Sequence, residues 1–354
     1  MIERRQTVQV KVADRVIGSG NPVLIQSMLN APASDVQANV RQAKELEAAG
    51  CELLRVAVPD KQAVGLIAPI KKAVGIPLVA DIHFDYRLAL ACVSEGIDKI
   101  RINPGNIGDD DRVRAVVEAC KQAGIPIRVG VNSGSVEKEI LAKYGSPTPE
   151  AMVESAMYHV RLIEKFDYDQ IVVSIKTSDV ANMVRSYRLM ADRAPYPLHL
   201  GVTEAGTERM GLVKSAVGIG SLLVDGIGDT IRVSLTAPPV KEIAAAKDIL
   251  KASGARSFGV NIVSCPTCGR TKIDLIGLAG RVEEALKNVD KPITVAVMGC
   301  AVNGPGEAKE ADFGVAGGQD CGLLFKKGEV IGKYPEQELL DALLHEILGD
   351  RTGE

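Results

Sequence analysis

The sequence predicts a (β/α)8 TIM barrel followed by a small α+β domain. Up to about Gly254, short apolar runs alternate with amphipathic helical stretches, and the runs number eight. Eight strand-helix units in roughly 250 residues are typical of a (β/α)8 barrel. Beyond Gly254 the predicted order becomes βαβββα, which indicates a separate α+β domain. We therefore predict a barrel at residues 1–254 and a second domain at residues 255–354.

The predicted barrel strands are short and rich in Leu, Ile and Val. They lie at 24–28, 53–58, 77–82, 99–104, 126–131, 171–176, 197–202 and 230–235. The helices between them carry start and stop signals: residues 34–50 begin at a Ser-Asp cap, repeat apolar residues at helical spacing and end at Gly50. A doubly wound sheet is the weaker alternative, because the glycine-rich phosphate loop expected after its first strand is missing.

The second domain begins near residues 254–257 and alternates strands and helices differently. Its predicted strands are 258–264, 292–299, 311–318 and a hairpin over 322–333 that turns at Lys327-Gly328. Its predicted helices are 273–289 and 335–349. This order suggests a small α+β domain of about 100 residues.

Composition excludes several classes of protein. The 354 residues carry a formal net charge of −3, which argues against a general nucleic-acid binder. The chain shows no signal-peptide core and no run approaching the roughly 18 apolar residues of a membrane span, so we predict a soluble, cytoplasmic protein. Seven scattered cysteines do not suggest a disulfide framework, and in a reducing compartment they are core residues or ligands.

Four predicted strands hold an arginine between apolar neighbours. These are Arg55, Arg101, Arg128 and Arg232. An unpaired charge removed from water costs several kcal/mol even after relaxation, so four such placements are hard to sustain without a shared anion. Further polar residues close to the strand ends should converge on the carboxyl-end mouth, where barrel enzymes place their active sites. They are Asp81, His83, Asn103, Asn132, Ser174, Lys176 and Ser234.

Four arginines and Lys176 around one opening would form a cradle for a polyanion, and a guanidinium suits phosphate oxygens well. The alternative is that each arginine pairs with a carboxylate inside the barrel, with Asp81 and Glu204 available. That pairing would absorb two charges and leave a surplus of cations. His83 is either a catalytic or substrate-binding residue or a satisfied core histidine, and Glu204 is either a proton donor or an arginine partner.

A second group of residues points to a metal centre. CPTC supplies Cys265 and Cys268, and MGCAVNGPGE supplies Cys300 and Glu307. This spacing fits zinc or an iron-sulfur cluster, and Cys321 could be a fourth zinc ligand. A zinc ribbon normally offers a second close pair of cysteines, which is missing. Three thiolates with a displaceable carboxylate favour a four-iron cluster that opens one iron to a substrate.

Six segments together resemble one enzyme family: VADIHFDYRLAL, RINPGNIG, HLGVTEAG, GDTIRVSL, CPTCGR and GCAVNGPGEA. They are similar to the 4-hydroxy-3-methylbut-2-enyl diphosphate synthases of the non-mevalonate isoprenoid pathway, in their compact bacterial form. The resemblance covers nearly the whole chain. It implies the reductive ring opening and dehydration of 2-C-methyl-D-erythritol 2,4-cyclodiphosphate to the open-chain allylic diphosphate, with two electrons consumed.

The resemblance also implies roles for individual residues. A [4Fe-4S] cluster would be held by Cys265, Cys268, Cys300 and Glu307. The diphosphate would be bound by Arg55, Arg128, Lys176, Arg232 and Ser234. The carbon and hydroxyl portion of the substrate would contact His83, Arg101, Asn103 and Asn132. Glu204 matches the family's proposed proton donor, a ferredoxin or flavodoxin would deliver electrons, and the active form would be a head-to-tail homodimer.

Two other functions are compatible with parts of the sequence. A zinc-stabilised phosphate-ester binding or transferase protein, comparable to pterin-binding barrels, would keep the barrel without redox chemistry. A regulatory module with the cluster as a sensor would bind ligand without turnover and would need a basic surface for DNA. The metal content of the purified protein and its turnover of the cyclic diphosphate distinguish the three.

Overall fold

The computed structural model describes residues 3–300, 306, 309–319 and 321–349. The chain divides into two compact units, Met1–Arg256 and Ser257–Glu354. This division lies two residues beyond the boundary expected from the sequence, which follows Gly254.

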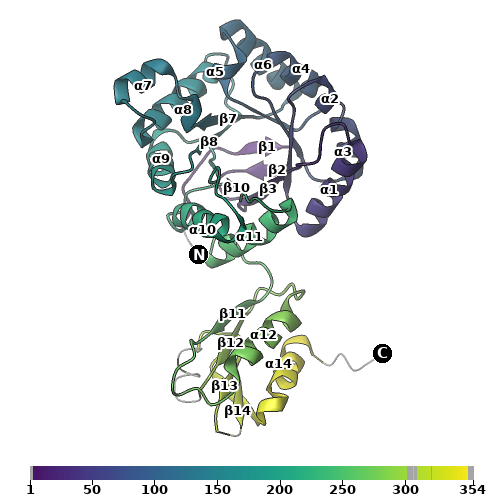
Figure 1. Cartoon of the computed structure of the whole chain (residues 1–354), viewed down its shortest axis with the longest axis vertical. Coiled ribbons are helices and arrows are strands. Elements are labelled where there is room, and N and C mark those ends of the chain that lie inside the picture. The colour runs from purple at the N-terminus through teal and green to yellow at the C-terminus, as the bar shows by residue number, and fades with distance from the viewer. Residues whose placement is uncertain (1–2, 301–305, 307–308, 320, 350–354) are drawn as a thin grey trace. The chain divides into compact units, whose positions relative to one another are not determined.

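The first unit is a parallel barrel, which confirms the predicted fold class (Figure 1). In the described part of the chain its strand order is β8-β7-β6-β5-β4-β3-β10-β9, and a parallel bridge between Val173 and Leu198 joins the two ends of that order. Parallel strands buried on both faces account for the nearly continuous apolar runs. The strands are β3 (Leu24–Met28), β4 (Leu53–Ala57), β5 (Leu78–Asp81), β6 (Lys99–Ile102), β7 (Ile127–Asn132), β8 (Ile171–Lys176), β9 (His199–Leu200) and β10 (Thr230–Ile231).

Helices form the outer ring of the barrel. The predicted caps are present: the Asp35 side chain accepts a hydrogen bond from the backbone N–H of Ala38 at 2.8 Å, and Gly50 and Gly124 end their helices in the left-handed conformation. The helices are α1 (Val36–Ala49), α2 (Lys61–Val64), α3 (Ile67–Ala73), α4 (Tyr86–Ser94), α5 (Pro104–Ile107), α6 (Asp110–Ala123), η1 (Ser133–Ser135), α7 (Lys138–Tyr144), α8 (Pro149–Glu164), α9 (Val180–Arg193), α10 (Glu208–Val224) and α11 (Pro239–Ala252).

The last two barrel strands are shorter than predicted. The sequence suggested strands over 197–202 and 230–235, whereas β9 and β10 contain two residues each. The Arg232 backbone N–H still donates to the Leu200 carbonyl at 2.9 Å. A Cβ on Gly201 would lie 2.8 Å from the Arg232 carbonyl oxygen, so the two backbones approach closely where the chain leaves the sheet. Arg232 and Ser234 therefore lie just beyond β10.

An antiparallel hairpin that we did not predict closes the amino-terminal end of the barrel. It consists of β1 (Val10–Val12) and β2 (Arg15–Ile17). Its buried residues pack against side chains at the amino ends of the barrel strands, and Figure 1 shows the hairpin across the barrel interior. The cluster contains Val10, Val12, Ile17, Leu24, Leu53 and Val172. The hairpin therefore seals the lumen with apolar side chains and leaves the carboxyl end as the open one.

The described elements of the second unit follow the order βαββββα, one strand more than the predicted βαβββα, because the two arms of the predicted hairpin over 322–333 are separate strands. Its strands are β11 (Asn261–Ser264), β12 (Thr294–Met298), β13 (Phe313–Gly317), β14 (Gly322–Lys326) and β15 (Glu329–Tyr334). Its helices are α12 (Leu275–Leu286), η2 (Glu336–Glu338) and α14 (Leu339–Leu348). In the part of the unit that is described, β11, β12 and β13 are parallel, and β14 and β15 complete the sheet antiparallel. A single apolar cluster joins this sheet to both α-helices.

Among the described residues, every helix is too short or too polar to cross a bilayer.

Ile17→Ala should lower the stability of the barrel, because it removes part of the apolar cluster that closes the amino-terminal end. Ile17 is fully buried in the hairpin cluster, and truncating a buried Ile to Ala typically lowers the free energy of unfolding by about 2–5 kcal/mol. Urea denaturation followed by circular dichroism measures the loss. The exposed neighbour Lys11→Ala is the control and should change stability by no more than about 0.5 kcal/mol. Equal stability of the two variants would show that the hairpin does not support the barrel.

Candidate functional site

Strand register places the charged side chains on the inner face of the barrel. Arg101 on β6 lies beside Asp81 on β5 and beside Arg128 on β7. Side chains two residues apart on a strand share a face, so Lys99 and Arg101 point to the same side. All of these residues are buried, with Arg128 and Lys99 fully so. The lumen is therefore lined by basic side chains, although the sheet around it is apolar.

Asp81 is the anion at the centre of this lining. Its carboxylate accepts from Arg55 at 3.0 Å and from Arg101 at 3.1 Å, and it lies 3.3 Å from Nε2 of His83. Burial alone would raise the pKa of Asp81. The guanidinium of Arg55, the hydrogen bond with His83 and the guanidinium of Arg101 outweigh burial and hold that pKa well below its usual range. Asp81 is thus a carboxylate shared by two arginines.

The remaining cations have weaker partners. Arg128 donates to the side-chain oxygen of Gln26 at 3.1 Å, and Arg232 lies 3.5 Å from Glu242 and 3.4 Å from the sulfur of Met28. Lys176 is nine-tenths buried. Its burial, followed by the charges of the surrounding arginines, lowers its pKa well below the usual range.

Positive charge exceeds negative charge in the described lumen. The five cations predicted from the sequence (Arg55, Arg101, Arg128, Lys176 and Arg232) face two buried carboxylates, Asp81 and Glu242, which leaves a formal surplus of three positive charges. Arg128 and Lys176 form no ion pair with either acid. Glu204, which we considered as a second internal acid, is exposed instead. Five buried guanidinium nitrogens of these lumen arginines have no hydrogen-bond partner, namely Arg55 Nε and Nη1, Arg128 Nε and Nη2, and Arg232 Nε. A buried donor that makes no hydrogen bond costs free energy, so the lumen is suited to binding an anion.

A cavity of about 510 Å³ opens at the carboxyl ends of the strands. Its lining residues are His83, Phe84, Asn106, Asn132, Ser133, Gly134, Ser135, Ser178, Thr203 and Glu204. His83 is about half exposed there, with its ring still next to Asp81. Glu204 has a φ of 51°, a left-handed backbone that is unusual for a residue with a side chain and is often found at functional sites.

Two asparagines of the predicted site lie on the same loop cluster. The Asn103 amide donates to the hydroxyl of Ser135 at 3.0 Å, and the backbone N–H of Asn132 donates to the same hydroxyl at 3.2 Å. The carbonyl oxygen of the Asn103 side chain is buried without a partner. Ser234 is partly buried beyond β10. Direct contacts thus join His83, Asp81, Arg55 and Arg101, whereas Ser234 makes no contact that fixes its role.

Sequence reasoning missed three polar residues of the lumen. Gln26 and Lys99 each lie two residues from an inward-facing neighbour, so the alternation within LIQSM and KIRI could have revealed them. Glu242 lies in the first turn of α11, where an acidic residue usually faces solvent. Nothing in the sequence indicates that its carboxylate reaches Arg232 and also accepts from Ser27 at 3.1 Å.

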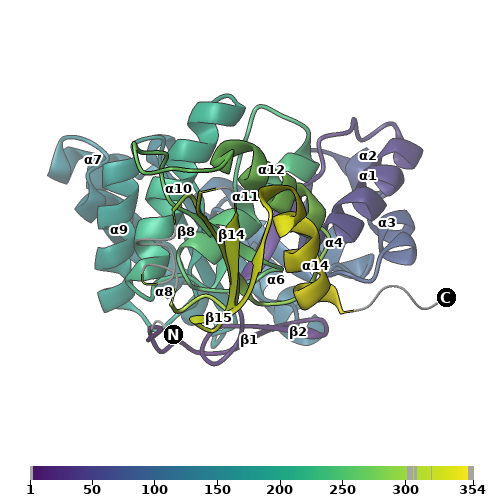
Figure 2. The same cartoon turned by 90° about the horizontal axis from the view of Figure 1, so that it is seen from below.

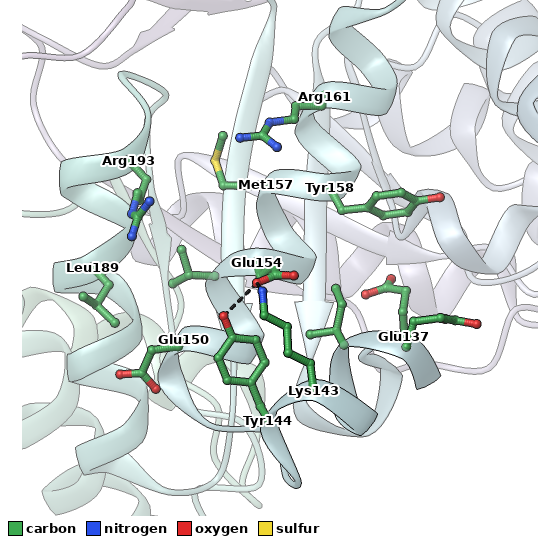
Figure 3. Close-up of a pocket in the computed structure, with 13 residues that line it drawn as sticks. Glu137, Lys143, Tyr144, Glu150, Glu154, Met157, Tyr158, Arg161, Leu189 and Arg193 are labelled. Atoms are coloured by element: carbon green, nitrogen blue, oxygen red, sulfur yellow. Dashed lines mark hydrogen bonds and ion pairs between the residues drawn. The ribbon is translucent and has the colours of Figure 1, made fainter.

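A second hollow, of about 750 Å³, lies on the outer helices α7, α8 and α9. Figure 3 shows Lys143 and Tyr144 directed at Glu154, with distances of 2.6 and 2.7 Å. The Glu154 carboxylate at the centre of this hollow is thus already paired with Lys143 and Tyr144. The hollow itself lies outside the ring of strands. We therefore place the candidate site at the barrel mouth.

The cysteines of the second unit follow two adjacent parallel strands. Cys265 comes directly after β11, and Cys300 comes two residues after β12, its parallel neighbour. The backbone N–H of Gly299 donates to the sulfur of Cys265 at 3.2 Å, which ties the two loops together. Hydrogen bonds from the backbone and side chain of Arg270 lower the pKa of the exposed Cys268. A thiolate at this position is what a metal ligand requires.

Cys321 is poorly placed to complete the same centre. It begins the turn into β14, and β13 separates β14 from β12. At about 4.8 Å per strand, its backbone lies roughly 10 Å along the sheet from that of Cys300. Glu307 lies outside the described residues. Within the part of the chain that is described, no three side chains of His, Cys, Asp or Glu already stand close enough together to hold a metal.

Two protein-family models match successive parts of the chain and show its family. The GcpE TIM-barrel domain matches residues 7–247, and the GcpE protein C-terminal domain matches residues 261–348. The chain belongs to the GcpE family. The division between the compact units, after Arg256, lies in the segment 248–260 between the two matches.

Curated relatives of this GcpE chain share its full length. A protein of Fusobacterium nucleatum subsp. nucleatum is 59% identical over 346 residues, which cover 98% of each chain. A protein of Caldanaerobacter subterraneus subsp. tengcongensis is 56% identical over 344 residues, which cover 97% of each chain. Both relatives are named 4-hydroxy-3-methylbut-2-en-1-yl diphosphate synthase (flavodoxin).

Among solved structures, the barrel of this GcpE chain is similar to dihydropteroate synthases. The enzyme of Stenotrophomonas maltophilia matches with a TM-score of 0.52 at 15% identity, over 70% of this chain and 97% of that one. The enzyme of Yersinia pestis matches with a TM-score of 0.50 at 14% identity, over 71% of this chain and 100% of that one. At such low identity the likeness shows the barrel fold alone.

Lys99→Met should stabilise this GcpE chain at pH 7. Burial, followed by the charge of Arg128, lowers the pKa of Lys99 well below its usual value, so between the folded and unfolded pKa values the unfolded chain binds more protons at this residue than the folded chain does. Unfolding then takes up a proton, and stability rises with pH up to about 10.5, the usual lysine pKa. Removing the amine should therefore stabilise the folded chain more at pH 7 than at pH 10.

Urea denaturation of the wild type and the Lys99→Met variant at the two pH values measures this difference. Lys121→Met, an exposed change on α6, should show no such dependence on pH. A stability difference for Lys99→Met that is the same at pH 7 and pH 10 would show that Lys99 keeps its proton in the folded chain.

Proposed function

We propose that this GcpE chain is a flavodoxin-dependent 4-hydroxy-3-methylbut-2-en-1-yl diphosphate synthase. It carries out the reductive ring opening and dehydration of 2-C-methyl-D-erythritol 2,4-cyclodiphosphate to the open-chain allylic diphosphate, with two electrons consumed. Relatives with this name share 56–59% of its residues over almost the whole chain. Within the structure, the observation that carries the proposal is the surplus of buried, unpartnered guanidinium groups in the lumen.

The lumen would bind the diphosphate. The free nitrogens of Arg55, Arg128 and Arg232 supply fixed donors, and a guanidinium matches phosphate oxygens in both shape and charge. Lys176 and Ser234 lie near the same end of the strands and would complete the cradle. An arriving anion would favour the charged form of Lys176, whose pKa is low in its absence.

The rim would hold the rest of the substrate. Asn103 and Asn132 are bridged by Ser135, which fixes the loops on which they lie. His83 is oriented by Asp81, the carboxylate that also fixes Arg101 and Arg55. Glu204 lines the mouth across from this group in the same cavity and is the residue that we assign as proton donor. These side chains would orient the ring and supply a proton as its carbon-oxygen bond opens.

The donor set of the second unit suits an iron-sulfur cluster better than zinc. Cys265, Cys268 and Cys300 would hold a [4Fe-4S] cluster, with Glu307 as the fourth ligand. The N–H of Gly299 on the Cys265 sulfur is the type of hydrogen bond that tunes such a centre, and Cys321 is about two strands too far away to make a zinc site of four thiolates. Such a cluster would supply electrons one at a time and a Lewis-acidic iron.

Two partners follow from this assignment. Flavodoxin, named for the curated relatives, would deliver one electron at each of two encounters. The active form would be a head-to-tail homodimer, in which the second unit of one subunit covers the barrel of the other.

Anaerobic turnover tests the proposed function. Protein purified without oxygen should contain iron and sulfide and absorb visible light, and with reduced flavodoxin it should convert the cyclic diphosphate to the open-chain diphosphate. A colourless protein with one zinc, or a coloured protein that binds the cyclic diphosphate without converting it, would overturn the assignment.

Arg232→Met should weaken the anion site without disturbing the fold. Arg232 is partly exposed at the mouth and has a free Nε, so its loss removes a charged hydrogen bond to the bound anion. Such a bond is worth about 1.5–3 kcal/mol, which corresponds to about 10–150-fold in affinity. Calorimetric titration with inorganic pyrophosphate measures the effect. Arg114→Met on the outer helix α6 should bind as the wild type does, and equal affinity for all three proteins would place the anion elsewhere.

Glu307→Ala should lower both cluster retention and turnover, because the fourth ligand would be lost. The iron and sulfide content per chain and the visible spectrum give a readout that does not depend on activity. Glu310→Ala, an exposed acid three residues away, is the matched control. Full cluster occupancy and normal turnover in the Glu307 variant would show that another group completes the centre.

A further inference from the structure

A buried histidine and a glutamate lie in contact next to the loops of the barrel mouth. His159, on α8, is fully buried, and its Nε2 lies 2.6 Å from Oε1 of Glu137, the residue that precedes α7. Figure 2 shows α7 and α8 on the same side of the barrel. We refer to these two residues as the His-Glu pair. Neither of them is assigned above to the substrate or to the cluster.

The His-Glu pair contacts the loop that follows β6. Gly105 lies in α5, and a Cβ placed on it would lie 2.8 Å from Cε1 of His159 and 3.3 Å from Oε1 of Glu137. A residue without a side chain is needed for the α5 backbone to come this close to the pair. Asn103, the residue that precedes α5, is two positions from Gly105. The place of Asn103 at the mouth therefore depends on the pair through the backbone of α5.

The pair also fixes the loop that follows β7, because Glu137 is the last residue of that loop. Ser135 lies two positions earlier, and its hydroxyl accepts from the Asn103 amide at 3.0 Å and from the backbone N–H of Asn132 at 3.2 Å. One hydroxyl thus joins the two loops at the cavity, and the His-Glu pair contacts both of them farther out. Both asparagines that we assign to the substrate lie between these two points of attachment.

Glu137 is ionised in this position. Burial alone would raise its pKa, but the interactions with the side chains of His159 and Ser155 outweigh burial and lower it. The side chain of Glu137 is only 21% exposed, so its carboxylate has little water to replace a lost partner. The contact with His159 is therefore a firm attachment rather than a chance surface contact.

We propose that Glu137 and His159 are positioning residues for the reaction. As a pair they hold the loops after β6 and β7 so that Asn103 and Asn132 reach the ring of the substrate. The proposal rests on the proposed function, in which these two asparagines contact the carbon and hydroxyl portion of the cyclic diphosphate. Glu137 and His159 act through the asparagines and do not touch the substrate themselves.

This role predicts a selective defect when the pair is broken. The arginines that would hold the diphosphate lie in β4, in β7 and just beyond β10, and none of them belongs to either loop. A shift of the loops should therefore weaken the contacts to the ring and leave the contacts to the diphosphate as they are. The loss of well-aligned hydrogen bonds from the two asparagines should weaken binding of the cyclic diphosphate by about 10-fold.

Glu137→Ala tests the proposal with two ligands. The anaerobically purified holoenzyme is titrated calorimetrically without a reductant, so that the cyclic diphosphate is bound and not converted. The variant should bind the cyclic diphosphate about 10-fold more weakly and should bind inorganic pyrophosphate, which has no ring, as the wild type does. If the pair serves stability alone, the folded variant will bind both ligands normally. That result, or an equal loss for both ligands, would overturn the proposal.

Glu154→Ala is the matched control. Glu154 also joins α8 to α7, through a 2.6 Å contact with Lys143, but it lies on the outer hollow rather than beside the mouth loops (Figure 3). Its loss should leave the affinity for both ligands unchanged. A selective loss of the cyclic diphosphate in this control would show that any weakening between the two helices has the same effect, and the specific role of the His-Glu pair would fall.

Gly105→Ala is the second variant, for use where Glu137→Ala does not fold. It leaves both members of the pair in place, but its new methyl group would lie 2.8 Å from Cε1 of His159, so that α5 or the pair must shift. It should show the same selective loss of the cyclic diphosphate. Normal affinity for both ligands in the folded Gly105→Ala chain would contradict the proposal.

A combined variant separates positioning from a general loosening of the site. In a chain that carries Asn103→Ala and Asn132→Ala, the pair has no ring contact left to position. Adding Glu137→Ala there should change the affinity for the cyclic diphosphate by less than about twofold, because residues that act through one another are not additive. A further loss of about 10-fold in that background would show that Glu137 acts by another route.

The wild type distinguishes failure of this proposal from failure of the proposed function. A wild type that neither binds nor converts the cyclic diphosphate would remove the function and the positioning role with it. A wild type that converts the cyclic diphosphate, with variants of unchanged affinity, would remove the positioning role alone.

Discussion

The barrel depends on one carboxylate that holds two buried guanidinium groups. Asp81 pairs with Arg55 and Arg101 at 3.0 and 3.1 Å and also orients His83. Breaking such a buried pair typically costs about 3–5 kcal/mol, because the remaining charge is left unpaired in a medium of low polarity. Asp81 and Glu242 neutralise only part of the positive charge, and Arg128 and Lys176 pair with neither acid. The candidate site thus carries a surplus of positive charge that a bound anion can neutralise.

Strand register determines which of these charged side chains face the lumen. Since side chains alternate between the two faces of a strand, a shift of one residue in β6 would move Arg101 and Lys99 out of the lumen and bring Ile100 in. The apolar hairpin closes the opposite end of the barrel, so the polar side chains face the mouth alone. The same closure keeps water from the base of the lumen, which strengthens every electrostatic interaction there.

The sequence was sufficient for the fold class, the barrel strands and the helix caps, because these follow from local periodicity and from residues such as Asp35 and Gly50. It was also sufficient to predict that arginines from different strands face the same lumen. It did not reveal the closing hairpin, whose VKV and RVI strands are short and separated only by Ala13 and Asp14. Nor could it reveal that Glu242, rather than Glu204, approaches Arg232, since that contact joins a helix to a strand end by tertiary packing alone.

In both units, candidate functional residues lie where parallel strands end. Loops that follow parallel strands emerge at one edge, so residues distant in sequence meet there without any need for a long excursion of the chain. In the barrel this edge carries Asn132, Lys176 and Arg232, while Arg55 and Arg128 lie deeper, within β4 and β7. In the second unit it brings Cys265 and Cys300 to neighbouring positions, tied by the N–H of Gly299. The antiparallel strands β14 and β15 lie beyond β13, which is why Cys321 stands apart although it is at the same edge.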